Sequence, residues 1–195
     1  FCMEWFIVGG LNVNFFNPIS DSFQSVTGNY PTKPPNSIYY GLLFTILANL
    51  QGPKIVLPTT VAGTSMNIKI YTMKYTVSNA ILILNKDMDP SKSGVVDLKM
   101  ADKSGMQCVY LTASSLSATS GFTFGGLQMV ANNSNFVGNY TRYLYNIDSN
   151  GYYHIPLNYS QAVYCISATS LSTISFPVAP EGYNIEKYFT LALSQ

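Results

Sequence analysis

Leu111 to Leu127 read LTASSLSATSGFTFGGL, a run of small and hydroxyl-bearing residues that ends in phenylalanines and glycines. Hydrophobic segments that alternate like strands lie on both sides of it. They are SMNIKIYTM (65–73), NAILILNKDM (79–88) and GVVDLKM (94–100) before it, and TRYLYNIDSNGYYHIPL (141–157) and AVYCISAT (162–169) after it. This succession predicts an antiparallel β-sandwich built from consecutive hairpins.

Two of these segments show the strand pattern most clearly. Met66, Ile68 and Ile70 alternate with other residues, which predicts a strand with one apolar face. Ile81 to Leu84 is apolar on both faces, as a central strand should be. The next residues, Asn85 to Gly94 (NKDMDPSKSG), have the composition of a turn that leads into the following strand.

Glycine marks two further turns. The glycines within Gly121–Gly126 are followed by neither the lysine nor the helix start of a phosphate-binding loop, so we interpret them as a bulge and turn between strands. Asn150-Gly151 tolerates the positive φ angles of a type I′ turn. It predicts a hairpin in which Tyr140–Ile147 pairs with Tyr152–Leu157.

The first 52 residues follow a different pattern. Phe1–Val8 has mid-helix character, Leu11–Phe16 alternates like a short strand, and a turn-rich loop occupies residues 17–36. Ile38–Leu47 then predicts a buried helix. Helix, strand, long loop and helix is the order expected at the end of a (β/α)8 barrel. The opening also predicts that the chain is a fragment of a longer protein.

The composition is that of an extracellular β-protein. Charged residues make up 10% of the 195-residue chain, against about 25% in an ordinary soluble domain, and aromatic residues make up 14%. The net charge is +1 and no basic cluster is present, which argues against nucleic-acid binding. No apolar run reaches the roughly 18 residues that cross a bilayer, so no membrane span is predicted.

Sequons and cysteines point to the same environment. Asn132, Asn139 and Asn158 begin Asn-x-Ser/Thr sequons, which favour a secreted glycoprotein, although a chain rich in Asn, Ser and Thr also produces such triplets by chance. Three cysteines allow at most one internal disulfide. Cys108 and Cys165 would form it if their strands pair, and buried free thiols are the alternative.

Three motifs together resemble glycoside hydrolase family 79, the heparanase and β-glucuronidase group. They are Ile38–Phe44 (IYYGLLF), Asn79–Asp89 (NAILILNKDMD), and Leu116–Gly121 followed by Phe124-Gly125-Gly126. The resemblance extends over roughly residues 1–169. It implies the last barrel strand and helices in residues 1–52 and a β-sandwich in 53–170. Residues 171–195 form a tail outside the resemblance, in which Tyr188–Leu193 could be a terminal strand. In this family the β-domain supports the catalytic barrel and performs no chemistry itself.

The resemblance also implies that the chain contains no catalytic residue. Family members hydrolyse glycosides with retention, using two glutamates at the ends of barrel strands four and seven. If Leu11–Phe16 is strand eight, both glutamates precede Phe1. Glu4 would then lie on a solvated helix face, and Asp21 alone cannot run a double displacement. We therefore expect the parent protein to be the enzyme and this chain to be inactive alone.

A part of the substrate pocket is expected in the loop after strand eight. Gly28-Asn29-Tyr30 resembles a family segment whose backbone N–H and tyrosine hydroxyl hold a uronic acid carboxylate. Asp21 lies in the same loop and could reach the sugar. An ordinary turn is the alternative interpretation, and Phe16 stands where relatives often carry a histidine, which puts ordinary substrate recognition in doubt.

Other chemistry has weaker support. His154 is the only histidine and no Cys-x-x-Cys occurs, so no metal, cofactor or Ser-His-Asp site is predicted. A cluster of tyrosines could bind sugars by stacking, but cross-strand packing explains them more economically. Its members are Tyr140, Tyr143, Tyr145, Tyr152, Tyr153, Tyr159 and Tyr164.

These observations predict the C-terminal portion of a secreted family 79-like hydrolase of polysaccharides or proteoglycans. Its partners would be its own catalytic barrel and a glycan. A lysosomal or cell-surface location is the alternative to full secretion. Two other functions remain open: a non-catalytic extracellular matrix glycoprotein that reuses the fold, and a carbohydrate-binding module.

Overall fold

The computed structural model describes residues 54–167, except for short gaps at 58, 76–77, 101–104, 119 and 130–135, together with Gly41. The strands are β1 (Lys54–Leu57), β2 (Ile68–Tyr75), β3 (Asn79–Asn85), β4 (Gly94–Lys99), β5 (Met106–Thr112), β6 (Thr123–Phe124), β7 (Gln128–Met129), β8 (Phe136–Val137), β9 (Tyr143–Tyr145), β10 (Tyr152–Leu157) and β11 (Gln161–Ser167). A 3-10 helix, η2 (Pro90–Lys92), lies between β3 and β4.

The expected barrel elements fall outside this description. Of residues 1–53 only Gly41 is described, and it is helical and exposed. The tail at 171–195 is likewise outside the described residues. Between residues 54 and 167 the described chain contains strands and η2 but no α-helix, and no described helix is long and apolar enough to cross a membrane.

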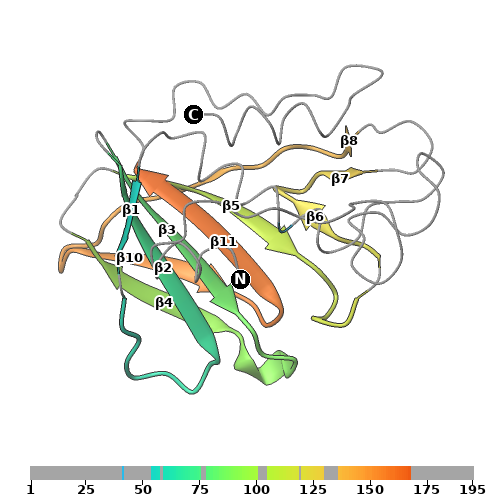
Figure 1. The fold of residues 1–195 in the computed structure, drawn as a ribbon, viewed down its shortest axis with the longest axis horizontal. Helices are drawn as coiled ribbons and strands as arrows, with labels where there is room; N and C mark the ends of the chain where they lie inside the picture. The colour runs from blue at the N-terminus through green and yellow to red at the C-terminus, as the bar shows by residue number, and fades with distance from the viewer. Residues whose placement is uncertain are drawn as a thin grey trace.

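One antiparallel sheet dominates the described fold. Its strand order is β1-β2-β3-β11-β5-β6 (Figure 1). β9 also pairs with β5. β6 and β9 occupy one edge of β5, with β6 opposite Leu111 and Thr112 and β9 opposite Met106 to Cys108. The prediction of a mainly β, antiparallel protein is confirmed for this part of the chain.

The central strands bury side chains on both faces of this sheet. In β3, Ile81 and Ile83 belong to one hydrophobic cluster, and Ala80 and Leu82 belong to a second. Alternate residues of a strand point to opposite faces, so each cluster lies on its own side of the sheet. This explains why Ile81 to Leu84 is apolar without interruption, and burial of each such large side chain contributes about 1.5–3 kcal/mol.

A second, two-stranded sheet covers the first of these faces. β10 pairs with β4 over the full length of both strands. Tyr153, Ile155 and Leu157 of β10 are completely buried in the same cluster as Val163 and Cys165 of the main sheet. The sandwich is therefore formed by the main sheet and the β4–β10 pair.

The predicted succession of simple hairpins is wrong at this point. β10 does not pair with Tyr140–Ile147; its partner is β4, and β9 pairs with β5. β11 also lies between β3 and β5. The reason is burial: β10 alternates buried and exposed residues and needs an apolar partner face, whereas Tyr143 and Leu144 of β9 are both exposed.

The Asn150-Gly151 turn forms, but with a different conformation from the predicted one. Gly151 has a φ of +83°, whereas Asn150 is not among the described residues with positive φ, so the turn is not type I′. Asp148 holds it instead: its Oδ1 accepts hydrogen bonds from the backbone N–H of Asn150 at 2.9 Å and of Tyr152 at 2.8 Å. Gly151 N also donates to Asp148 O at 3.1 Å.

The NKDMDPSKSG segment after β3 is a turn, as predicted. Asn85 is 2% exposed, donates from Nδ2 to Lys92 O at 2.8 Å and accepts from Asp87 N at 3.1 Å. Asp87 then accepts from Asn67 N at 2.6 Å, and its carbonyl accepts from Ser160 Oγ at 2.9 Å. The polar residues of this motif therefore connect three loops, and their observed role is structural.

The Leu111–Leu127 stretch connects the main sheet to the second hydrophobic cluster. Phe122 and Phe124 are buried in that cluster, with Ala113 and Ala118 packed against it. A tight turn follows, in which Phe124 N and Leu127 N each donate to the other residue's carbonyl. Gly125 and Gly126 have φ of +56° and +82°, a combination that favours glycine at both positions. The predicted glycine turn is thus confirmed.

This glycine turn also fixes the chain before β9. Gly125 N donates to Tyr110 O at 2.8 Å, and Thr141 N donates to Gly125 O at 2.7 Å. A Cβ at Gly126 would lie 2.7 Å from the carbonyl oxygen of Asn139, and one at Gly138 would lie 2.5 Å from that of Gly126. Only glycine allows backbones to approach this closely.

Candidate functional site

All four residues predicted to bind substrate lie outside the described part of the chain. Gly28, Asn29, Tyr30 and Asp21 are among residues 1–53, of which only Gly41 is described. Asn132 lies in the gap at 130–135. The other two sequon asparagines are described and exposed: Asn139 precedes β9, and Asn158 lies in the turn between β10 and β11.

The structure contains a disulfide between Cys108 and Cys165. The two residues are directly opposite each other in the pairing of β5 with β11, and both are completely buried. Structural disulfides persist in oxidising compartments, so this bond is consistent with an extracellular protein.

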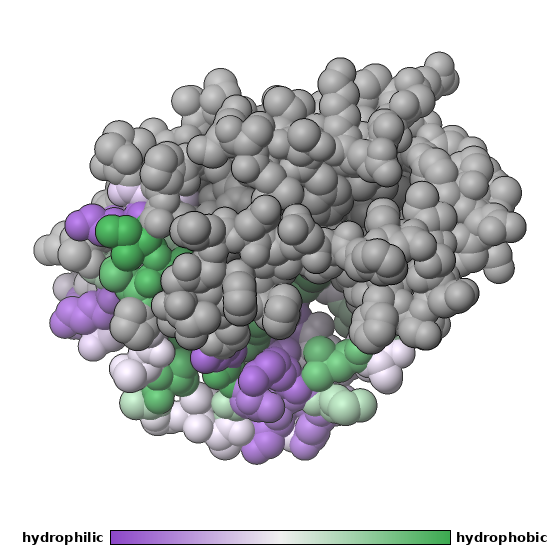
Figure 2. Space-filling view, viewed as in Figure 1, coloured by the Kyte–Doolittle hydropathy of each residue, from purple (hydrophilic) through white to green (hydrophobic). Residues whose placement is uncertain are grey.

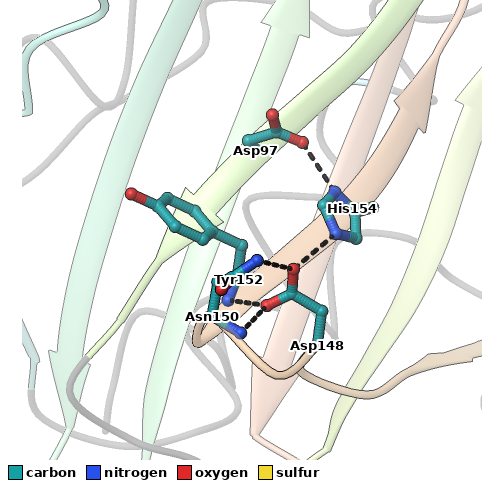
Figure 3. A network of polar contacts seen from close by, with 5 residues as sticks. All are labelled: Asp97, Asp148, Asn150, Tyr152 and His154. Atoms are coloured by element: carbon teal, nitrogen blue, oxygen red, sulfur yellow. Dashed lines mark hydrogen bonds and ion pairs between the residues drawn. The ribbon is translucent and has the colours of Figure 1, made fainter.

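His154 lies on the outer face of the β4–β10 pair between two carboxylates (Figure 3). Its Nδ1 is 2.7 Å from Asp97 Oδ1, and its Nε2 is 3.3 Å from Asp148 Oδ2. The hydrogen bond with Asp97, followed by that with Asp148, raises the pKa of His154. The backbone N–H of Tyr152 is the main group that lowers the pKa of Asp148.

This arrangement is suited to holding strands together rather than to catalysis. His154 and Asp97 are exposed, and both ring nitrogens of the histidine are occupied by carboxylates. Neither nitrogen is left to activate a nucleophile. Within residues 54–167, as far as they are described, no three His, Cys, Asp or Glu residues are grouped so as to hold a metal ion.

The structure divides the tyrosine cluster into packing residues and accessible residues. Tyr153 and Tyr164 are 0% and 2% exposed, so core packing explains them. Tyr143 is 47% exposed, and Tyr145 is half-buried beside it in β9. Tyr140, Tyr152 and Tyr159 are likewise half-buried, so Tyr143 is the exposed member of the cluster.

A hollow of about 380 Å³ lies where β9 meets β5, β6 and β10. Tyr110, Thr112, Thr123, Tyr143 and Tyr145 contribute to its walls from the main sheet. The rest of the lining comes from the glycine turn, the segment before β9, β10, the β10–β11 turn and the start of β11: Gly125, Gly126, Thr141, Pro156, Asn158 and Gln161. The volume is within the usual range for small-molecule sites, about 300–1,000 Å³. The walls combine aromatic rings with hydroxyl and amide groups.

The sequence did not identify this hollow in advance. Tyr110 and Thr112 lie in a segment that reads as an ordinary strand, and Thr123 lies between two phenylalanines. Their proximity to Tyr145 depends on β9 pairing with β5. Figure 2 shows hydrophilic and hydrophobic groups side by side on the part of the described surface that is visible in that view.

Comparison with solved structures shows the fold. The chain is similar to a 4-O-α-L-rhamnosyl-β-D-glucuronidase from Fusarium oxysporum 12S, with a TM-score of 0.56 and 17% identity over 69% of this chain and 30% of the fungal protein. A GH51 arabinofuranosidase from Xanthomonas axonopodis pv. citri has a TM-score of 0.43 and 11% identity, over 74% of this chain and 29% of the bacterial protein. No protein-family model and no curated protein matches the sequence. The described fold therefore resembles the C-terminal β-sandwich region of a glycoside hydrolase.

Proposed function

We propose that this chain is the C-terminal portion of a secreted glycoside hydrolase similar to family 79. Residues 1–52 would complete a (β/α)8 barrel, residues 53–170 would form the β-sandwich that braces it, and residues 171–195 would be a tail. The whole protein would hydrolyse a β-linked uronic acid or a related sugar in a polysaccharide or proteoglycan. The two glutamates that the reaction needs would precede this chain.

The observation that carries this proposal is a main sheet with a hydrophobic cluster on each face. The β4–β10 pair packs against one face. The other face buries large aromatic side chains, among them Tyr71, Tyr75 and Tyr164. Burial raises the pKa of Tyr75 to about 12, and its hydroxyl lies 3.3 Å from that of Tyr164. We propose that the barrel lies on this second side of the sheet.

Substrate contacts in this proposal come from the barrel portion. Gly28, Asn29 and Tyr30 would hold the carboxylate of the sugar, with Asp21 nearby. The disulfide and the exposed sequon asparagines Asn139 and Asn158 support secretion and glycosylation. The similarity to the fungal β-glucuronidase supports the fold that this arrangement requires.

The test is to express this chain alone and joined to the sequence encoded upstream of it. Hydrolysis of a chromogenic aryl β-glucuronide and of arylglycosides of other sugars is then measured. The proposal predicts activity only in the longer protein, and loss of that activity when either upstream glutamate is replaced by glutamine. If the longer protein is folded and hydrolyses none of these arylglycosides, the proposed hydrolase activity is contradicted and a non-catalytic matrix glycoprotein is supported.

A further inference from the structure

The hollow exists because the second sheet covers only part of the main sheet. Tyr110 and Tyr145 belong to the hydrophobic face that packs against β4 and β10. Among the described strands β10 pairs with β4 alone, so its other edge faces the hollow. Pro156 on this edge has no N–H, which suits a strand edge that continues no ladder.

Hydrogen bonds fix the tyrosines in the hollow. The Tyr110 hydroxyl donates to Pro156 O at 2.9 Å and lies 2.9 Å from the Tyr145 hydroxyl. Because a phenol has one hydrogen, Tyr145 must be the donor to Tyr110. The Tyr145 oxygen is then left as an acceptor toward a ligand. Tyr143 packs edge-to-face on Tyr110 with ring centroids 5.3 Å apart, which holds its own ring in place.

Other residues that line the hollow supply hydrogen-bond donors. The hydroxyls of Thr112 and Thr123 are 2.6 Å apart, and only one of their two hydrogens can lie between them. The other hydroxyl hydrogen is available to a ligand. Gln161 uses its Oε1 to accept from Asn158 N at 2.9 Å, which leaves its NH2 group to donate.

The lining carries no formal charge. Neither an acidic nor a basic side chain is among the described residues that line the hollow. A carboxylate or sulfate ligand would therefore enter without a cation to pair with it, and a cationic ligand without an anion. An aromatic ring with directional hydroxyl and amide groups around it suits a ligand that has an apolar face and several hydroxyls.

We propose that this hollow binds one neutral sugar unit of a glycan, with the ring stacked on Tyr143. Tyr145 accepts a hydrogen bond from a sugar hydroxyl, and the threonine pair and Gln161 donate to sugar oxygens. The unit is a neutral hexose or N-acetylhexosamine. It comes either from a separate glycan or from the chain's own N-glycan on Asn158, which borders the hollow. This site does not depend on the proposed hydrolase activity.

The first experiment uses the full chain produced without glycosylation. Titration with neutral and uronic-acid oligosaccharides is followed by calorimetry and by NMR of the backbone amides. We expect neutral glycans to bind and Tyr143→Ala to weaken binding about tenfold. Tyr145→Phe, which removes one hydroxyl, should weaken it about fivefold. Leu144→Ala is the matched control, because Leu144 is an exposed β9 residue that does not line the hollow.

The second experiment separates the two sources of the sugar. The chain glycosylated at Asn158 is treated with an endoglycosidase, with and without Tyr143→Ala. If the chain's own glycan occupies the hollow, the glycosylated form does not bind free glycans and Tyr143→Ala accelerates glycan removal. Circular dichroism and a melting curve show whether each variant is folded. The proposal is overturned if neutral glycans do not bind the unglycosylated chain and Tyr143→Ala leaves glycan removal unchanged, or if only acidic glycans bind.

Discussion

Replacing Gly126 by alanine tests how the Leu111–Leu127 stretch determines the fold. Gly126 has a φ of +82°, and a Cβ there would lie 2.7 Å from the carbonyl oxygen of Asn139. A left-handed φ costs a non-glycine residue about 1–2 kcal/mol. Crowding against a neighbour that cannot rotate away adds about 1–3 kcal/mol. We therefore expect Gly126→Ala to lower the free energy of unfolding by about 2–5 kcal/mol.

The matched control is Gly151→Ala. Gly151 has nearly the same φ, +83°, but a Cβ there would meet nothing within 4 Å. This variant should lose only the conformational part, about 1–2 kcal/mol. Urea denaturation of both variants, monitored by far-UV circular dichroism, measures the difference between their free energies of unfolding. Equal losses in the two variants would refute the reasoning, because the close approach of the 125–126 and 138–139 backbones would then contribute nothing.

Three further predictions concern the interactions that hold the sandwich together. Asn85→Ala should lower the free energy of unfolding by about 1–3 kcal/mol in urea denaturation, because the Lys92 carbonyl and the Asp87 N–H lose their hydrogen-bond partner. Asn146→Ala, at an exposed position, is the control and should change it by less than about 0.5 kcal/mol. Similar losses in the two variants would contradict this. Combining Cys108→Ala with Cys165→Ala should cost about 4 kcal/mol for a sequence separation of 57, and an unchanged urea midpoint would contradict it. His154 has a raised pKa, so its stabilising contribution is present below its ordinary pKa of about 6.5 and is lost as pH rises through the folded value. The urea midpoint of the unmodified protein relative to His154→Gln should therefore fall as pH rises above about 6.5, and a constant difference would rule out this linkage.

The pattern of apolar residues predicted the strands well because buried positions of a strand are occupied by apolar residues. Ile81 to Leu84 is apolar at every position, and β3 does lie inside the main sheet with both faces covered. The glycines at 125 and 126 are needed for a tight turn, and that turn forms. In each case the requirement is local, so neighbouring residues are enough to show it.

Strand pairing was not predictable in the same way. The Asn150-Gly151 turn indicates a chain reversal but does not specify which strand β10 will contact. β10 pairs with β4, more than 50 residues earlier, because Ile155 and Leu157 require the apolar face of the main sheet. The hollow was missed for the same reason: Tyr110, Tyr145 and Pro156 come from three strands whose contacts depend on that pairing.

The central claim, that this chain is part of a larger hydrolase, is tested most directly by the intact mass of the protein from its source after enzymatic deglycosylation. The account predicts a mass well above that of 195 residues, with the two glutamates in the additional sequence. A mature protein with the mass of this chain alone, and no companion subunit, would contradict it.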